Sequence, residues 1–316
     1  MGKRLLSTGF LLFALTVPAL PQEASPENGP ENGPEIFRLI ATDPAPHYAT
    51  AKEAADAFAA QIRANDFGAS ARILGLDATK LKEDDEATAT FERLRKELEQ
   101  RLTIVGEGDD QIMQFGDKLW PLPFPIVKGD DGQWSFDTIA GLEEILDRRI
   151  GENELEAIET VRAYVDAQVE YFSADRDADG IQEYAQKLIS TSGKTDGLYW
   201  PSDQGDGESP AGDGIDQAEL DDASRGEGYF GYRFRILTGQ GDNVAGGSYD
   251  YVINGNMIGG FALIAWPVKY GDTGIQTFVV NQQGIVYETD LGDETETIAS
   301  YIDRFNPDDR WNITND

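Results

Sequence analysis

The chain has 316 residues, 40% of them apolar, so it can bury a sizeable core and is long enough for two domains. Its 58 acidic side chains outnumber 26 basic ones, which gives a formal net charge of −32 at pH 7. A negative field repels nucleic acid and anionic lipid, so neither is an expected partner. The acidity fits either a solubilising surface or cation binding. The absence of cysteine argues against disulfides, thiolate metal sites and a lipoprotein anchor.

Residues 1–20 have the layout of a secretory signal peptide. Lys3 and Arg4 precede an apolar run over 9–17, and a small residue follows at Ala19, near which we expect cleavage. The run is shorter than the about 20 apolar residues of a membrane span, and no later stretch is long enough. We therefore expect a periplasmic or secreted mature protein, without membrane insertion. A buried N-terminal helix is the alternative interpretation.

Three further segments follow the predicted signal peptide. Residues 21–35 repeat Pro, Glu, Asn and Gly, a composition typical of a linker. We expect an N-terminal domain over 36–150 and a second domain over 151–316.

The first domain is predicted to be a helix-rich α+β domain. Apolar residues recur at helical spacing over 51–62 and again over 91–105, which predicts two amphipathic helices. Residues 129–132, Gly-Asp-Asp-Gly, indicate a hairpin turn, and the prolines at 121, 123 and 125 predict an edge or irregular strand. A short helix over 142–150 is expected to end at Gly151.

The second domain is predicted to pack a long helix on an antiparallel sheet. The apolar periodicity predicts a helix from about residue 152 to Ser173, followed by a surface loop over 203–224. A hairpin turn is expected at 281–284 and a closing helix over 295–305, capped by Asp293. Alternating or short apolar runs predict strands at 230–236, 249–253, 261–266, 276–280 and 285–287.

Several motifs in the second half resemble one exported bacterial family, domain of unknown function 2950 (DUF 2950). They are Gly-Tyr-Arg-Phe-Arg at 231–235, Asp-Tyr-Val-Ile-Asn-Gly at 250–255, Gly-Phe-Ala at 260–262, Ala-Trp-Pro at 265–267 and Thr-Phe-Val-Val-Asn at 277–281. The resemblance implies no known activity. More loosely, a long helix followed by these strands is similar to the globular part of type IV pilin-like proteins. The second domain is therefore expected to be pilin-like, although its helix lacks the apolar N-terminal span of pilins.

The best chemical motif follows the long helix. Asp175, Asp177 and Asp179 alternate and Gly180 allows a sharp turn, as in calcium-binding loops. In that register the carbonyl of Ile181 is a further ligand. The twelfth position holds Gln186 where glutamate is expected, so Glu183 is the candidate replacement. The alternative is a solvated acidic turn. The acidic loop over 203–216 is a weaker candidate of the same kind.

Other chemistry is poorly supported by the sequence. His47 is the only histidine, so a zinc site with several histidines cannot be built. A Ser-His-Asp catalytic triad would have to use His47 itself. Paired carboxylates remain available for hydrolysis. Aromatic residues could line a groove for a glycan or a peptide, or pack in the core. Tyr199 and Trp200 are predicted to be the most exposed of them.

The sequence therefore predicts an exported binding or scaffolding module of the bacterial envelope or exterior, more consistent with a non-enzymatic protein. Its expected partners are an envelope protein or a glycan, with calcium as a candidate stabilising ion and no other cofactor. The alternative is a carboxylate-dependent hydrolase of the cell envelope. Two close carboxylates in a deep pocket would favour the hydrolase, and an exposed apolar or aromatic surface would favour the binding module.

Overall fold

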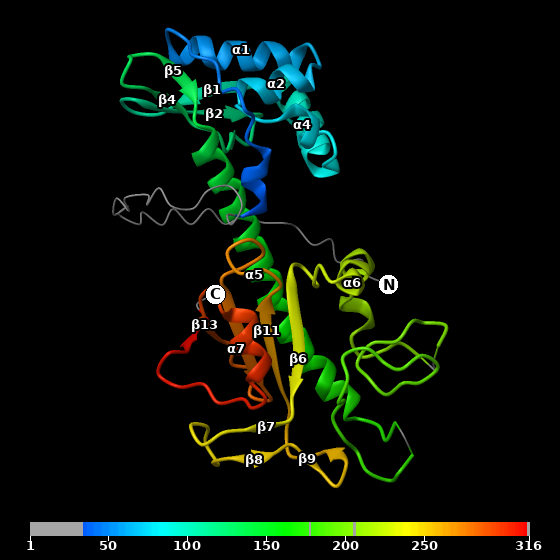
Figure 1. Cartoon of the computed structure of the whole chain (residues 1–316). Coiled ribbons are helices and arrows are strands. Elements are labelled where there is room, and N and C mark those ends of the chain that lie inside the picture. The colour runs from blue at the N-terminus through cyan, green and yellow to red at the C-terminus, as the bar shows by residue number, and fades with distance from the viewer. Residues whose placement is uncertain (1–33, 177, 205–206, 315–316) are drawn as a thin grey trace. The chain divides into compact units, whose positions relative to one another are not determined.

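The computed structural model describes residues 34–176, 178–204 and 207–314 (Figure 1). The predicted signal peptide and most of the predicted linker lie outside the described residues. The helices of the first half are η1 (Glu35–Leu39), α1 (Ala51–Arg63), α2 (Phe67–Ile73), α3 (Ala78–Leu81) and α4 (Asp85–Gln100). The strands that follow are β1 (Leu102–Val105), β2 (Asp110–Phe115), β3 (Trp120–Pro121), β4 (Ile126–Lys128) and β5 (Trp134–Phe136).

Helix α1 shows why these residues form a helix on a sheet. Its first turn is capped by the Thr50 side chain, which accepts a hydrogen bond from the Glu53 N–H at 3.1 Å. Phe58 and Ile62 lie one turn apart and are buried in the first core. The Phe58 ring centroid lies 5.4 Å from that of Phe136 in β5. Packing of the apolar stripe against the sheet therefore stabilises both elements.

The sheet of the first half is antiparallel, in the order β1-β2-β4-β5 with β3 paired to β2. The predicted turn at 129–132 joins β4 and β5, closed by a 2.9 Å hydrogen bond from the Gly132 N–H to the Gly129 carbonyl. The proline-rich segment contributes only the two residues of β3, in agreement with the predicted irregular strand.

One predicted helix was too long. Helix α4 ends at Gln100, whereas Leu102 and Val105 lie in β1 opposite Phe115 and Ile112. The run Leu-Thr-Ile-Val is rich in β-branched residues, which favour a strand over a further helical turn.

Helix α5 (Thr138–Tyr171) is continuous, and this corrects the predicted helix end at Gly151. It begins after Asp137, whose side chain accepts a 3.0 Å hydrogen bond from the Ala140 N–H. Its N-terminal part contributes Leu142, Leu146 and Ile150 to the first core, and its C-terminal part contributes Ala157, Val161, Tyr164, Ala167 and Tyr171 to the second. Burial on both sides of Gly151 outweighs the about 1 kcal/mol by which glycine disfavours a helix. The predicted domain boundary after residue 150 falls inside this helix.

The second half contains the larger sheet. Its helices are η2 (Gly212–Gly214), α6 (Gln217–Arg225) and α7 (Thr295–Tyr301). Its strands are β6 (Tyr232–Leu237), β7 (Gly239–Gln240), β8 (Tyr249–Asp250), β9 (Val252–Ile253), β10 (Asn256–Met257), β11 (Ala262–Pro267), β12 (Gln276–Asn281), β13 (Tyr287–Asp290) and β14 (Asn312–Ile313). The main sheet is antiparallel in the order β14-β13-β12-β11-β6, and β7-β8 and β9-β10 form separate pairs.

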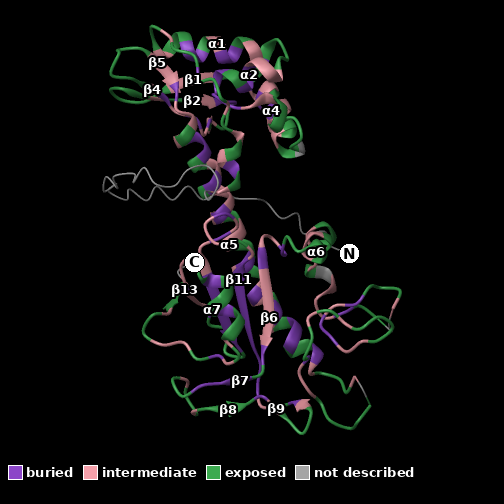
Figure 2. Cartoon of the chain, viewed as in Figure 1, coloured by how far each residue is buried: buried purple, intermediate pink, exposed green. Residues whose placement is uncertain are grey.

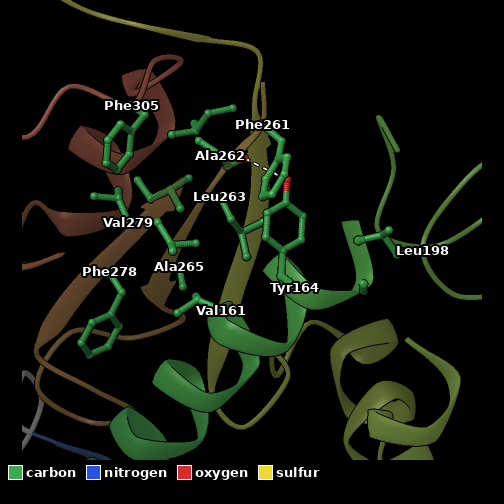
Figure 3. Close-up of a cluster of buried hydrophobic side chains, with 14 of the residues drawn as sticks. Val161, Tyr164, Leu198, Phe261, Ala262, Leu263, Ala265, Phe278, Val279 and Phe305 are labelled. Carbon is green, nitrogen blue, oxygen red and sulfur yellow. Dashed lines mark hydrogen bonds between the residues drawn. The ribbon is translucent and has the colours of Figure 1, made fainter. Parts of the chain in front are cut away.

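Helices cover both faces of the main sheet. On one face, Val161 and Tyr164 of α5 pack beside Leu263 and Ala265 of β11 (Figure 3). The Tyr164 hydroxyl also donates to the Ala262 carbonyl at 3.2 Å. On the other face lies α7. Strand β11 is therefore buried along its whole length (Figure 2). A long helix on an antiparallel sheet confirms the α+β fold class predicted for this half.

Helix α7 is attached to β6 by arginine side chains. Arg235 donates to the carbonyl oxygens of Ala299, Ser300 and Ile302 at 2.6–2.9 Å, which satisfies the C-terminal end of the helix. Arg233 pairs with Glu296 at 2.6 Å. Because side chains alternate along a strand, Arg233 and Arg235 point to one face of β6 and Phe234 points to the other. Helix α7 therefore lies on the face that does not carry Phe234.

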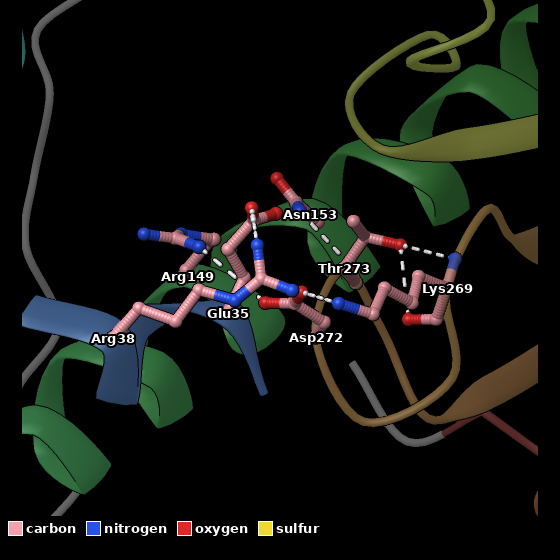
Figure 4. Close-up of polar contacts among 7 residues, drawn as sticks. All are labelled: Glu35, Arg38, Arg149, Asn153, Lys269, Asp272 and Thr273. Carbon is pink, nitrogen blue, oxygen red and sulfur yellow. Dashed lines mark hydrogen bonds and ion pairs between the residues drawn. The ribbon is translucent and has the colours of Figure 1, made fainter. Parts of the chain in front are cut away.

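A polar junction connects the middle of α5 to the loop before β12 (Figure 4). Asn153 donates to the Thr273 carbonyl at 2.9 Å. The Asp272 carboxylate, whose side chain is 8% exposed, lies 2.7 Å from the Lys269 ammonium and 3.6 Å from the Arg149 guanidinium. The loop is thereby held at the part of α5 that connects the two cores.

The structure corrects three further predictions. The supposed surface loop at 203–224 contains α6, which begins after Asp216 and ends at Gly226. The predicted strand at 249–253 is divided between β8 and β9, in two different pairs. Helix α7 ends at Tyr301, and Asp293 does not cap it, because its N-cap position is Glu294, which makes no side-chain cap bond.

Among the helices of the described residues, none combines the length and apolar character needed to cross a membrane.

Candidate functional site

The predicted calcium loop follows the C-terminal end of α5. Its described carboxylates accept hydrogen bonds from the loop backbone: Asp175 from the N–H groups of Ala178 and Gly180 at 2.8 and 2.9 Å, and Asp179 from Ile181 at 2.7 Å. Gly180 adopts a φ of 89°, in keeping with the sharp turn that was predicted there. These hydrogen bonds fix the turn through the carboxylates themselves.

The same loop is attached to the β9–β10 hairpin. The second oxygen of Asp179 accepts from the Asn256 amide at 2.7 Å, and Glu183 accepts from the Met257 N–H at 2.9 Å. Ile181 is 42% exposed, and Asp177 lies outside the described residues. Within the ranges the structure describes, no group of three or more acidic or histidine side chains is arranged to hold a metal ion. Calcium binding here stays a prediction.

The acidic loop over 203–216 is only partly described. Asp206 and the side chain of Asp213 lie outside the description, and Asp216 caps α6 by accepting from the N–H groups of Ala218 and Glu219. The carboxylate of Asp216 therefore has a structural role in starting a helix.

The aromatic residues that the sequence singled out pack mainly in the core. Trp200 is only 2% exposed, so its predicted exposure was wrong. Its ring lies 5.4 Å from the Arg176 guanidinium, which also covers Tyr171 at 4.9 Å. The buried members of the set are Trp200, Tyr229, Tyr232, Tyr251 and Trp266, whereas Tyr199 and Tyr249 are partly or largely exposed.

His47 lies at the surface beside an acidic turn. Its Nδ1 is 3.2 Å from a carboxylate oxygen of Asp131, and both side chains are close to half exposed.

Two open hollows lie between α7, β13 and the C-terminal segment. One hollow of about 620 Å³ is lined by apolar Leu291, Ile298, Ile302 and Trp311 together with polar residues of β12 to β14. A second, of about 320 Å³, shares Ile302, Arg310 and Trp311 with the first. We call the two together the Trp311 groove. The sequence analysis did not predict this site, because no motif marks it. The only available sign was Trp311, a large aromatic residue in an otherwise polar C-terminal stretch.

Polar residues at one end of the groove come from neighbouring strands. Glu288 of β13 lies opposite Asn312 of β14, and Gln276 of β12 lies opposite Asp290. All four residues border the larger hollow. Glu288 is paired with Phe278 and Phe278 with Ala265, so their side chains point to the face of the sheet that α5 covers, away from α7. Asp290 accepts from the Tyr270 hydroxyl at 3.2 Å and from the Gly292 N–H at 2.7 Å. For the side chains of Gln276, Glu288 and Asn312, no hydrogen bond or ion pair is formed with any other described residue.

The side chain of Glu288 lies on the α5 face of the sheet, near Glu154. Burial raises its pKa, and the nearby Glu154 carboxylate raises the pKa further because two negative charges repel. Glu154 itself accepts hydrogen bonds from the N–H groups of Ile275 and Gln276, both at 2.9 Å. Burial first, and then the fixed carboxylate of Glu154, therefore raise the proton affinity of Glu288 above that of an ordinary glutamate.

A guanidinium group also lies in the groove wall. Arg310 is held by Asp308 through a forked contact at 2.8–3.1 Å, and this pairing lowers the pKa of Asp308 and raises that of Arg310. Its charge is therefore largely matched within the groove.

A protein-family model with the description "Protein of unknown function (DUF2950)" matches residues 46–314. The chain belongs to the DUF2950 family. This confirms the resemblance seen in the sequence motifs. The match on this DUF2950 protein runs from before α1 to just past β14, so it includes the second core, the first core except Ile36 of η1, the 175–183 loop and the Trp311 groove. No curated protein and no solved structure matches the chain.

Proposed function

We propose that this DUF2950 protein is an exported, non-enzymatic binding or scaffolding module of the bacterial envelope or exterior, with the Trp311 groove as its contact site. The observation that supports this most is the groove itself. It combines a half-buried tryptophan with aliphatic neighbours and a few polar side chains, which is the usual composition of a ligand site. Its envelope partner is a protein or a glycan.

The proposed export rests on the charged and apolar pattern of residues 1–20, and the strong negative charge suits an exported protein that must stay dispersed. Calcium at the 175–183 loop would act as a stabilising ion in this proposal, remote in sequence from the groove.

A matched pair of variants on α7 tests the role of the groove. Ile298 is 40% exposed and lines the larger hollow, whereas Tyr301 is 82% exposed and is not part of either wall. Ile298→Asp places a charge in the groove, and Tyr301→Asp places the same charge on the same helix outside it. The mature protein is mixed with isolated cell-envelope material and sedimented.

The proposal predicts that the wild-type protein and Tyr301→Asp sediment with the envelope and that Ile298→Asp does not. Sedimentation of all three proteins to the same extent would place the contact elsewhere. If the wild-type protein does not sediment with the envelope material, the proposed function is rejected.

A second candidate function is a carboxylate-dependent hydrolase of the cell envelope. The specific observation in its favour is the raised pKa of Glu288, which lies near the carboxylate of Glu154. A hydrolase would need Glu288 to hold and deliver a proton. Loss of envelope-glycan turnover in Glu288→Gln, with sedimentation unchanged, would support the hydrolase; absence of turnover by the wild-type protein would leave the binding module.

A further inference from the structure

We propose that strand β6 binds a short extended segment of a partner protein, with apolar residues at alternating positions and a basic residue at one end. Strand β6 forms the edge of the main sheet opposite β14, so this surface is separate from the Trp311 groove (Figure 1). An edge strand with unpaired backbone groups can accept a further strand from another chain. The inference goes beyond the proposed function, because it adds a second contact surface and names the chemistry of its partner.

The backbone groups of β6 alternate between β11 and the open edge. The Val268 N–H donates to the Gly231 carbonyl at 2.9 Å, which fixes the hydrogen-bonded pairs between the two strands. Since such pairs alternate along an antiparallel ladder, the N–H and carbonyl groups of Phe234 and Ile236 point away from β11. Within the ranges that the structure describes, these four groups make no hydrogen bond.

The chain itself occupies the edge on both sides of this open stretch. On one side Tyr229 and Tyr232 exchange two backbone hydrogen bonds, at 2.8 and 3.1 Å, and on the other the Tyr251 N–H donates to the Thr238 carbonyl at 2.7 Å. These bonds use the outward groups of Tyr232 and Thr238, the next outward residues before and after the open pair. A bound segment must therefore be short and turn away at both ends.

The face of β6 toward α5 offers apolar contacts to such a segment. Phe234 is paired with Ala265, and both Phe234 and Ile236 are only partly buried against the second core. On the other face α7 holds the arginine side chains of β6, through Glu296 and the carbonyl oxygens at its C-terminal end, so they do not shield the edge. Apolar side chains two residues apart in the segment would pack beside Phe234 and Ile236.

Carboxylates gather at the Tyr229 end of the edge. Glu219 accepts a hydrogen bond from the Phe230 N–H at 3.0 Å, and the backbone N–H of Asp216 donates to the Tyr229 hydroxyl at 3.0 Å. Burial raises the pKa of Tyr229. The negative charges of Asp216, Glu219 and Glu156 raise this pKa further, so all three carboxylates act on this end of the edge. A basic residue is attracted there and an acidic residue is repelled.

A second copy of this chain fits the edge less well. If the outward groups of Phe234 and Ile236 bonded to those of another copy in antiparallel order, Arg235 would lie opposite its own equivalent. Like charges directly opposite each other destabilise a sheet. Each copy also carries a formal charge of −32, so two copies repel each other. A basic segment of another protein avoids both costs.

Titration of the full mature protein with labelled peptides, followed by fluorescence anisotropy, tests this inference. The probe is the hexapeptide Thr-Val-Thr-Val-Thr-Lys with blocked ends, in which the valines and the lysine share one face when the chain is extended. One control probe has glutamate in place of the lysine. Another is N-methylated at both valines, which removes the N–H groups that would face β6.

Ile236→Pro and Ile236→Val are a matched pair of variants. Proline removes the outward N–H group without removing a hydrogen bond to β11, whereas valine keeps this N–H with a side chain of similar size. Thermal unfolding shows whether each variant is folded. Amide hydrogen exchange of the wild-type protein is a second measurement, because the N–H groups of Phe234 and Ile236 should become protected when a segment binds.

We expect saturable binding of the lysine probe, weaker binding of the glutamate probe and none of the N-methylated probe. Ile236→Pro should weaken the binding roughly tenfold, the effect of losing about one hydrogen bond, and Ile236→Val should bind as the wild type does. Exchange at Phe234 and Ile236 should slow when the lysine probe is added. If Ile236→Pro does not fold, the N-methylated probe and the exchange measurement decide the result.

Several results would overturn the inference. They are absence of binding by the lysine probe, equal binding of the glutamate or the N-methylated probe, or exchange at Phe234 and Ile236 that the probe does not change. Formation of a dimer that is lost in Ile236→Pro would replace the partner segment by a second copy. None of these results bears on the Trp311 groove, which the α7 variants Ile298→Asp and Tyr301→Asp test separately.

Discussion

The buried side-chain amide of Gln168 pairs with both backbone groups of Ala185, donating to the carbonyl oxygen and accepting from the N–H, each at 2.8 Å. The same amide nitrogen donates to the Tyr164 hydroxyl at 3.0 Å. The Gln168 side chain thus makes the two backbone hydrogen bonds that a neighbouring strand would otherwise make with Ala185. These bonds fix the segment that follows the 175–183 loop.

Replacing Gln168 by leucine should therefore destabilise the protein. It leaves the N–H and carbonyl of Ala185 without partners in a buried site, at a cost of about 1–3 kcal/mol for each group. Urea unfolding measures the loss. The control is Val169→Ala, since Val169 is 61% exposed and a surface change costs at most about 0.5 kcal/mol. Equal stability of the two variants would contradict the assigned role of Gln168.

The continuity of α5 gives opposite predictions for two of its glycines. At Gly151 an added methyl group meets no atom within 4 Å, so Gly151→Ala should stabilise the protein by about 1 kcal/mol through helix propensity. At Gly141 the methyl group would overlap the Phe124 ring, so Gly141→Ala should destabilise it. Thermal unfolding of both variants is the measurement. A lower midpoint for Gly151→Ala would mean that the helix breaks there.

Asp196 should contribute stability that is lost at acidic pH. Burial alone raises its pKa, but hydrogen bonds from Lys187 and Thr191 outweigh this and lower the pKa to about 2. A pKa below its unfolded value means that the stabilisation is fully present above about pH 4 and is lost as the pH falls toward 2. Asp196→Asn should be less stable than the wild type at pH 7.

The stability difference between wild type and Asp196→Asn should then shrink as the pH falls from about 4 to 2. Unfolding midpoints across this range measure it. Asp203→Asn, a change at an exposed carboxylate of the same region, serves as the control. A difference that is independent of pH would argue against the assigned contacts.

Calcium binding predicts a midpoint of thermal unfolding that rises with calcium concentration relative to chelator, because an ion that binds only the folded state stabilises it by mass action. Asp177→Asn with Asp179→Asn should remove the rise. If the midpoint of the wild type does not move, the calcium prediction is rejected, and the structural hydrogen bonds of Asp175 and Asp179 account for the acidic residues of this loop.

Local pattern was sufficient for much of the fold. The apolar stripe of α1, the Gly-Asp-Asp-Gly turn between β4 and β5 and the turn before β13 were all predicted, because helix and strand periodicity and turn chemistry depend on neighbouring residues. The family motifs were likewise readable from the sequence. The Asp-Gly turn after α5 was also predicted, although its ion was not tested.

Tertiary structure decided what depends on distant partners. Gly151 looked like a helix end, but cores at both ends of α5 hold the helix together across it. Trp200 looked exposed beside acidic residues, yet it packs under Arg176. The Trp311 groove exists only because β13, β14 and α7, which are separate in the sequence, come together around one indole ring. Packing between elements decides which side chains share a surface. The local periodicity of the sequence does not contain that information.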